Sequence, residues 1–337
     1  MAGILIEAPL RLAGLGTRRL ATLAIQKSGI TEGAIVIVDE IEHGLEPHRI
    51  IGAIAQLKAD QVNAVNHRTP VGQVLMTTHS DVALAEAGAE SLRVVATIRP
   101  SRQATIAKPS SPSPIQALMR FTPRALFARR VLVTEGNTEI GMLLGIRENW
   151  PARHANKPIE QLGVAIADGN GEQACSMALA LGSLGYLTAI YRDSDTTLSS
   201  DNQAALIADA ISVFEYGSGL NTEQAIFSAA NDDLVQELLI YARSERGDNA
   251  INDNLKIKIP ELTIEVIRGN FNVWKASTNL NGQQLREAIS EVAARKKWFK
   301  DQRIGRGLAP MVWKIAIENP TSLLAQAFSQ VEAWLYA

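Results

Sequence analysis

The chain contains one cysteine, Cys175, in 337 residues. A single thiol cannot close an intrachain disulfide, which fits a reducing cytoplasmic compartment, and it shows no zinc-ligand spacing with the five histidines. No apolar run reaches about 18 residues, the length that would predict a membrane-spanning helix. The N-terminus lacks the charged and apolar regions of a secretion signal. We therefore expect a cytoplasmic protein without a membrane partner.

Neither sign of charge dominates, since the chain has 33 Lys and Arg residues and 35 Asp and Glu residues, which gives a net charge of −2. This balance does not by itself indicate a nucleic-acid binder, because an acidic catalytic centre would offset a basic surface. With 46% hydrophobic and 20% charged residues, the chain is long enough for two domains with their own cores.

A phosphate-binding loop is also missing, because the pattern Gly-x-x-x-x-Gly-Lys-Ser/Thr occurs nowhere in the chain. The backbone amides and the lysine of such a loop bind the β- and γ-phosphates of ATP, and the chain lacks them. The chain alone should bind ATP poorly.

Other ATPase-like segments are nevertheless present in the N-terminal third. An apolar run over residues 34–38 ends in Asp39 and Glu40, and a second run over 74–78 leads to His79. Upstream, Gly14, Gly16 and Thr17 open a segment with helical spacing. This order resembles ABC-type ATPases, with a signature, Walker B, D-loop and switch histidine. The resemblance implies that Asp39 holds a magnesium-bound water, Glu40 polarises the attacking water and His79 contacts the γ-phosphate.

Two explanations fit an ATPase without its phosphate loop. The chain is either the distal half of a split or truncated ATPase or a degenerate ATPase that serves as a scaffold. Met1 lies only about a dozen residues before the signature-like segment, which favours the first explanation. In that case ATP would bind only together with a partner chain.

Acidic residues follow three further strand-like runs, at residues 131–133, 164–167 and 187–191. Parallel strands deliver such side chains to one edge of a sheet, and hard divalent cations prefer oxygen ligands. The acids are Glu135, Glu139, Asp168, Asp193 and Asp195. Each of them alone is also compatible with an ordinary turn or helix cap. Together and in this order, they predict a magnesium or manganese site.

Residues 130–215 resemble the Toprim domain, in which a Glu after the first strand precedes an Asp-x-Asp. Glu139, four residues after Glu135, is similar to the second glutamate of OLD-family nucleases. An ABC-type part followed by Toprim is the organisation of that family. By this resemblance Glu223 is a further metal ligand, and the catalytic lysine lies in the segment 296–300, with Lys300 as the first candidate and Lys297 as the second. The alternatives are that Glu223 complements a helix dipole and that Lys300 belongs to a solvated helix face.

The Pro/Ser-rich stretch 100–114 predicts a linker. We expect an α/β protein, with a partial ABC-type ATPase domain over 1–99 and a Rossmann-like parallel sheet of Toprim type over 115–220. A helical C-terminal region over 221–337 would complete the site. Residues 92–98 should form the last strand of the ATPase-like sheet.

The resemblance implies a metal-dependent DNA endonuclease that uses two Mg²⁺ or Mn²⁺ ions, in the setting of phage defence. Its catalytic residues would be Glu135, Glu139, Asp193, Asp195 and Lys300. A basic segment around Lys300 would contact DNA phosphates. We expect a homodimer, or a hetero-assembly with a chain that carries the phosphate loop. The alternative is a regulatory or structural subunit that is inert without such a partner. A primase or topoisomerase is disfavoured, because zinc-ligand cysteines and a tyrosine-bearing cleavage domain are absent.

Overall fold

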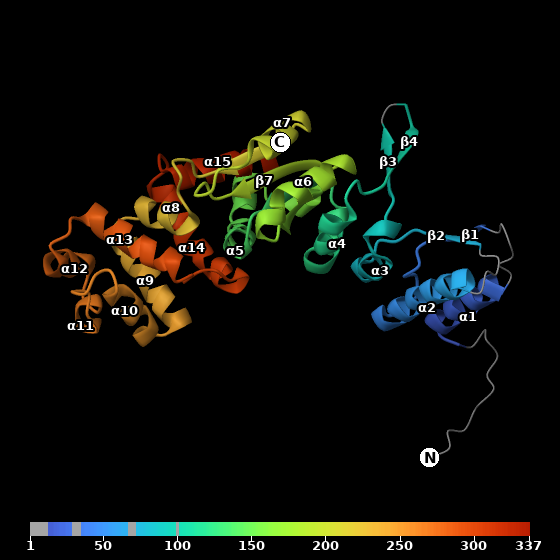
Figure 1. Cartoon of the computed structure of the whole chain (residues 1–337), viewed down its shortest axis with the longest axis horizontal. Coiled ribbons are helices and arrows are strands. Elements are labelled where there is room, and N and C mark those ends of the chain that lie inside the picture. Colours follow the sequence, from blue (N-terminus) through green and yellow to red (C-terminus); the bar gives the residue numbers. More distant parts are fainter. Residues whose placement is uncertain (1–12, 29–34, 67–71, 99–100) are drawn as a thin grey trace, which may run out of the picture. The chain divides into compact units, whose positions relative to one another are not determined.

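The computed structural model describes residues 13–28, 35–66, 72–98 and 101–337 (Figure 1). The chain divides into two compact units, Met1–Val94 and Val95–Ala337. No helix in the described part of the chain is both long and apolar enough to cross a bilayer.

The first unit pairs two short parallel strands with helices. Its elements are α1 (Leu15–Ser28), β1 (Ile35–Val38), α2 (Pro47–Asn66), β2 (Gln73–Met76), α3 (Asp81–Ala87) and a 3₁₀ turn at Ala89–Ser91. Val38 of β1 pairs with Met76 of β2, and the core around Val38 includes Ile41 and Ile54. Both predicted strands are therefore confirmed. Helix α2 begins at Pro47, which suits the first helical turn.

The segment between the two sheets differs from the prediction. Residues 94–98 form β3 (Val94–Ile98), which pairs with β4 (Gln103–Ala107) in a separate two-stranded sheet. The expectation that 92–98 extend the ATPase-like sheet was therefore wrong. Residues 100–114, which the Pro and Ser content favoured as a linker, contain β4 and the start of α4 (Pro112–Phe121). Pro112 stands at the start of α4, where its missing N–H costs no hydrogen bond.

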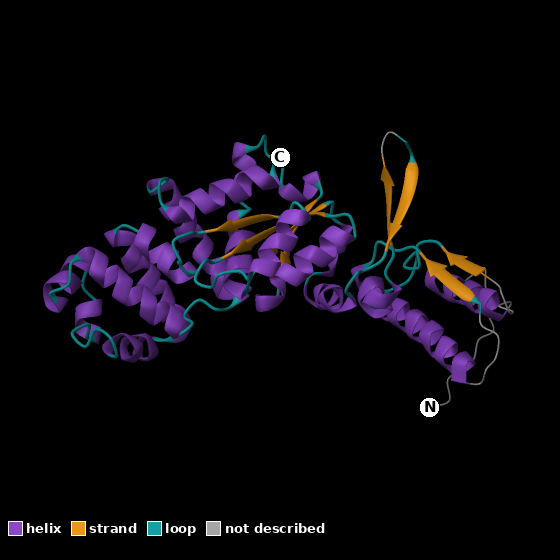
Figure 2. Ribbon diagram, turned by 45° about the horizontal axis from the view of Figure 1, so that its top comes forward, coloured by secondary structure: helices purple, strands orange, loops and turns teal. Residues whose placement is uncertain are grey.

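A four-stranded parallel sheet forms the centre of the second unit, in the order β6–β5–β7–β8. The strands are β5 (Arg130–Thr134), β6 (Val164–Asp168), β7 (Leu187–Arg192) and β8 (Ser212–Glu215). Helices α5 (Asn137–Ile146), α6 (Ala174–Ser183) and α7 (Ser200–Ala208) connect them, and 3₁₀ turns lie at Pro123–Phe127, Trp150–Arg153, Ile159–Leu162 and Gly171–Gln173. Helices cover both faces of this sheet (Figure 2). The three apolar runs predicted as strands are confirmed, and the α/β fold class with them.

Helices make up the remainder of the second unit. They are α8 (Thr222–Ala229), α9 (Asp232–Arg246), α10 (Asp248–Lys256), α11 (Ile264–Ile267), α12 (Phe271–Thr278), α13 (Gly282–Arg295), α14 (Gln302–Glu318) and α15 (Leu323–Leu335). Their buried residues, such as Ile289 and Leu308, share one hydrophobic core with Leu132 of β5 and Ala189 of β7. The helical region is thus continuous with the sheet, and both need the same core to be stable.

Helices α5 and α14 meet backbone to backbone through small residues. A Cβ atom built on Gly141 would lie 2.3 Å from the carbonyl oxygen of Gln302, and one on Gly305 would lie 2.6 Å from that of Thr138. Only glycine permits this approach at these positions. The crossing brings the residues before α14, including Lys300, to the beginning of α5.

Candidate active site

An acid stands at the carboxyl end of each strand of the four-stranded sheet. Glu135 directly follows β5 and Asp193 directly follows β7, whereas Asp168 and Glu215 are the last residues of β6 and β8. Thr134 pairs in register with Asp168 on one side and with Tyr191 on the other. Because all four strands run parallel, these acids share one edge of the sheet.

Two further acids reach this edge from the first turns of helices. Glu139 in α5 is buried, and its Oε1 accepts a hydrogen bond of 2.6 Å from Thr222 Oγ1. Glu223 in α8 is buried as well. Asn221 caps α8 through a capping box with Gln224, so Glu223 is free of the capping role.

A chain of hydrogen-bonded, buried hydroxyls ends at Glu139. Tyr191 OH donates to Tyr216 OH at 2.6 Å, and Tyr216 OH lies 3.3 Å from Thr222 Oγ1, which donates to Glu139. The chain joins the middle of the sheet to the first turns of α5 and α8. It satisfies each hydroxyl and fixes one oxygen of Glu139.

The acids raise one another's proton affinity. Burial raises the pKa of Asp193 to about 8, together with a hydrogen bond to the side chain of Asp195 and the charge of Glu135. Burial also raises the pKa of Glu223 to about 7, with Glu139 adding to the shift. The pKa of Glu135 is raised by burial, although Arg192 opposes the shift. In such a crowded cluster the carboxyls hold protons more readily, and a bound cation would take the place of these protons.

Two oxygens of this cluster are buried without a hydrogen-bond partner, namely Glu135 Oε2 and Asp193 Oδ1. Buried polar atoms are rarely left in this state, and oxygen donors of this kind suit Mg²⁺ or Mn²⁺. Within the described ranges, however, no three His, Cys, Asp or Glu side chains are arranged to hold a metal ion. The residue types and the two oxygens therefore fit a divalent cation, whereas a complete ligand set requires side-chain movement.

Arg192 occupies the position beside Glu135. Its Nε lies 3.4 Å from Glu135 Oε2, its Nη1 lies 3.1 Å from Glu215 Oε2, and its Nη2 donates to the carbonyl of Thr196 at 2.6 Å. One nearly buried guanidinium thus bridges acids from β5 and β8. The guanidinium therefore supplies positive charge beside Glu135 and opposes the upward shift of its pKa.

Asp168 has a local role in the structure. Its Oδ1 accepts a hydrogen bond of 2.9 Å from the backbone N–H of Asn170, whose φ is 53°. This is the turn chemistry that the sequence also allowed. The next residue, Gly169, approaches Thr134 so closely that a Cβ would lie 2.4 Å from its carbonyl oxygen, which fixes Asp168 beside the end of β5.

Lys300 lies close enough to the cluster for its charge to oppose the upward shifts in the pKa values of Glu135 and Glu223. Thr138 Oγ1 donates to the carbonyl of Phe299 at 3.1 Å and ties this segment to α5. Trp298 and Phe299 are buried in the core, so they anchor the basic segment and cannot stack on bases. The structure therefore brings Lys300 to the predicted site.

Sequence reasoning missed three residues of this arrangement: Arg192, Glu215 and Thr222. A local signal was present for two of them. Arg192 directly precedes Asp193, and Glu215 ends an apolar run as the other acids do. Thr222 carried no such signal, because its bond to Glu139 joins residues 83 positions apart.

The ATPase-like residues of the first unit form a second arrangement. Asp39 Oδ1 accepts a hydrogen bond of 2.6 Å from the Oγ1 of Thr77, the residue after β2. The backbone N–H of Glu40 donates a hydrogen bond of 2.8 Å to the same hydroxyl. The two strand ends are thereby joined as the parallel pairing predicts. Asp39 and Glu40 are exposed, and Glu40 has a φ of 47°.

His79 and the glycine-rich segment attach to the loop after β1. The His79 N–H donates to Glu42 Oε1 at 2.5 Å, and Thr78 Oγ1 donates to Glu42 Oε2 at 2.7 Å. Burial of Glu42 raises its pKa, but these two bonds, a bond to the backbone of Glu42 itself and the charge of His79 together make the net shift downward. A Cβ on Gly16 would lie 2.6 Å from the carbonyl oxygen of Gly44.

Thr17 follows Gly16 in α1, and its Oγ1 accepts a hydrogen bond of 3.5 Å from Arg49 Nη1. Gly14 immediately precedes α1, and its carbonyl accepts a bond of 3.1 Å from the Arg18 N–H.

A comparison with family models supports the reading of this first unit. Residues 3–85 match the model described as "AAA domain, putative AbiEii toxin, Type IV TA system". The chain therefore carries an ATPase-like domain. No curated protein matches the chain.

Proposed function

We propose that this protein is an OLD-like, divalent-metal-dependent DNA endonuclease with a Toprim-type site. The observation that carries the proposal is the set of acids at one sheet edge, in which Glu135 Oε2 and Asp193 Oδ1 are buried without hydrogen-bond partners. The proposed metal ligands are Glu135, Glu139, Asp168, Asp193, Asp195 and Glu223. Bound Mg²⁺ or Mn²⁺ would activate a water and stabilise the leaving oxygen of a phosphodiester.

The protein's own side chains would prepare this chemistry. The hydroxyl chain that ends at Thr222 holds Glu139 in one orientation. Lys300, positioned through the bond between Thr138 and the Phe299 carbonyl, would stabilise charge that develops on the phosphate. The raised proton affinity of Asp193 means that a cation must displace a proton there, so metal binding should strengthen as the pH rises.

A second candidate is a subunit that works only with a partner chain. The two-stranded parallel sheet of the first unit leaves Ile35, Ile37 and Leu75 more than half exposed, although parallel sheets are normally covered on both faces. Together with the missing phosphate loop, this favours a partner that completes the ATPase-like domain and brings ATP. In the first candidate, the ATPase-like unit would mediate a homodimer. Phage defence is the setting that the OLD resemblance suggests for either.

The deciding experiment is cleavage of supercoiled plasmid by the purified full chain with Mg²⁺, Mn²⁺ or EDTA. We expect metal-dependent nicking or linearisation that is lost in the double variant Asp193→Ala, Asp195→Ala. The matched control is Asp233→Ala, which removes an exposed aspartate of α9 that is not among the proposed ligands. Metal-dependent cleavage that survives in the double variant would refute the assignment. An inert chain that becomes active on adding a phosphate-loop ATPase partner would establish the second candidate.

A further inference from the structure

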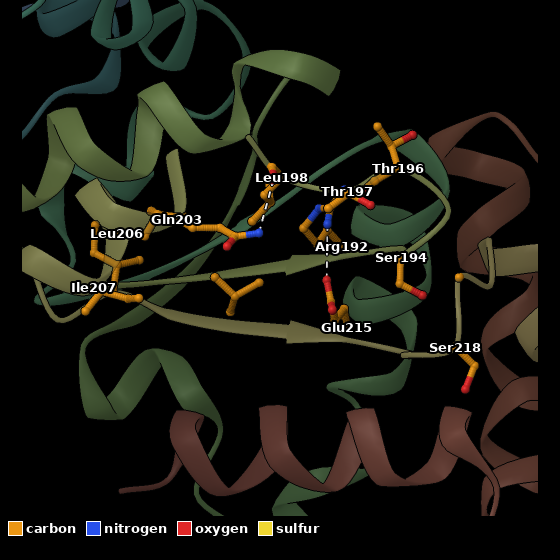
Figure 3. Close-up of a pocket in the computed structure, with 13 residues that line it drawn as sticks. Arg192, Ser194, Thr196, Thr197, Leu198, Gln203, Leu206, Ile207, Glu215 and Ser218 are labelled. Atoms are coloured by element: carbon orange, nitrogen blue, oxygen red, sulfur yellow. Dashed lines mark hydrogen bonds and ion pairs between the residues drawn. The ribbon is translucent and has the colours of Figure 1, made fainter. Parts of the chain in front are cut away.

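A pocket of about 480 Å³ opens beside the proposed metal-binding acids, at the carboxyl ends of β7 and β8 (Figure 3). It begins at Arg192 and Ser194, which flank Asp193, and extends to α7 and to the turn at Ser218. A pocket of this size accommodates a small organic ligand. Its position places any ligand next to the acids.

The pocket has one apolar side and one polar side. Leu206, Ile207, Ile211 and Val213 supply the apolar side, and Ile207 is 78% exposed although it is a large hydrophobic residue. The polar side carries the hydroxyls of Thr197 and Ser218 and the guanidinium of Arg192. A ligand that matches both sides needs an apolar planar or ring portion and an anionic or polar portion.

The charges narrow the ligand class further. Among the described lining residues, Arg192 is the cation and Glu215 the acid, and Arg192 also pairs with Glu135 outside the lining. Two carboxylates therefore share one guanidinium. The contact with Glu135 is the weaker, since its 3.4 Å ion pair contains no hydrogen bond to Oε2. An incoming phosphate, which binds Arg bidentately, can replace that contact.

We infer that this pocket binds one nucleotide unit of the substrate strand, with its phosphate on Arg192 and its sugar and base against the side formed by Leu206 and Ile207. The inference rests on the proposed nuclease function for the identity of the strand. The pocket itself is defined by the lining residues alone. Phosphate binding would draw Arg192 from Glu135 and leave that carboxylate available at the sheet edge, so the nucleotide and Glu135 compete for one guanidinium.

Direct binding in EDTA tests the pocket without metal and without cleavage. The probe is thymidine 3′,5′-bisphosphate, titrated into the full chain by calorimetry. Ile207→Asp places a negative charge at the opening of the pocket and should weaken binding at least about fivefold by repelling the phosphates. The matched control, Ile240→Asp, changes an exposed isoleucine of α9 that does not line the pocket and should stay within about twofold of wild type.

Competition for Arg192 gives a prediction of opposite sign. Glu135→Gln removes one carboxylate from the guanidinium and should tighten probe binding in EDTA by about threefold or more. Glu172→Gln, which removes the charge of an exposed glutamate outside the lining, should have little effect. A general change in net charge would shift both variants alike.

Three results would overturn the inference: no saturable binding by the wild-type chain, equal binding by Ile207→Asp, or inorganic phosphate that binds as tightly as the bisphosphate. The last would show that the apolar side contributes nothing. Failure of plasmid cleavage with intact probe binding would refute the nuclease but leave the nucleotide pocket. Cleavage without probe binding would refute only the pocket.

Discussion

The close crossing of α5 and α14 makes Gly141→Ala a stringent test of the structure. The added methyl group would lie 2.3 Å from the Gln302 carbonyl oxygen and 2.9 Å from the Arg306 backbone nitrogen. Both neighbours are backbone atoms of the segment that begins α14, so relief requires the helix to move. Overpacking of this kind costs about 1–3 kcal/mol, and the upper half applies because no flexible side chain can yield.

Alanine's higher helix propensity offsets about 1 kcal/mol of that cost. We therefore expect Gly141→Ala to lower the free energy of unfolding by about 1–2 kcal/mol. With a urea m-value of about 3 kcal/mol/M, the midpoint falls by about 0.5 M. Chemical unfolding of the full chain, followed by circular dichroism, measures this shift.

Gly182→Ala in α6 is the matched control. Its nearest neighbour would be Ile211 Cδ1 at 3.5 Å, an ordinary contact, so the substitution should raise stability by about 0.5–1 kcal/mol through helix propensity alone. A Gly141→Ala chain as stable as wild type, or stabilised to the same extent as Gly182→Ala, would show that α5 and α14 do not cross as described.

Three further predictions concern the acids. Burial raises the pKa of Asp193 to about 8 in the folded chain, against 3.8 for the unfolded group, so the folded state holds more protons between these values. The free energy of unfolding of the metal-free chain should therefore fall as the pH rises from about 4 to about 8, by on the order of 1–2 kcal/mol after solvent screening. Urea unfolding across this pH range should show a smaller fall in Asp193→Asn. Thr222→Val removes the hydrogen-bond donor to buried Glu139 and should lower the free energy of unfolding by about 1–3 kcal/mol in the same assay. The control Thr122→Val removes a buried hydroxyl that has no hydrogen-bond partner and should leave stability unchanged. Equal losses in the two variants would contradict the role of the hydroxyl chain. Lys300→Met should lower the cleavage rate by about 10–100-fold with unchanged stability, whereas an equal loss in Lys297→Met would point to a general effect of basic charge on DNA binding.

Local pattern was enough to predict the strands and the acids that follow them. The apolar runs before Glu135, Asp168 and Asp193 became β5, β6 and β7, because a buried parallel strand needs a short, continuous apolar segment. The start of α2 at Pro47 is an equally local feature, since capping and proline geometry involve only neighbouring residues. The ATPase-like order of the first unit rests on local segments too, and the family match to residues 3–85 agrees with it.

The pairing of distant residues was decided by tertiary structure. Residues 94–98 are apolar enough to form a strand in either sheet, and their local sequence does not specify that they pair with β4. The ion pair of Arg192 with Glu135 and the bond from Thr222 to Glu139 depend on side chains that meet across 57 and 83 positions. The sequence by itself determined that the runs of β1, β2, β5, β6 and β7 form strands and that acids end or directly follow β1, β5, β6 and β7, because those choices depend on near neighbours. Tertiary structure decided which acids meet, which cation neutralises them and how closely α14 approaches α5, because these depend on the packing of the whole core.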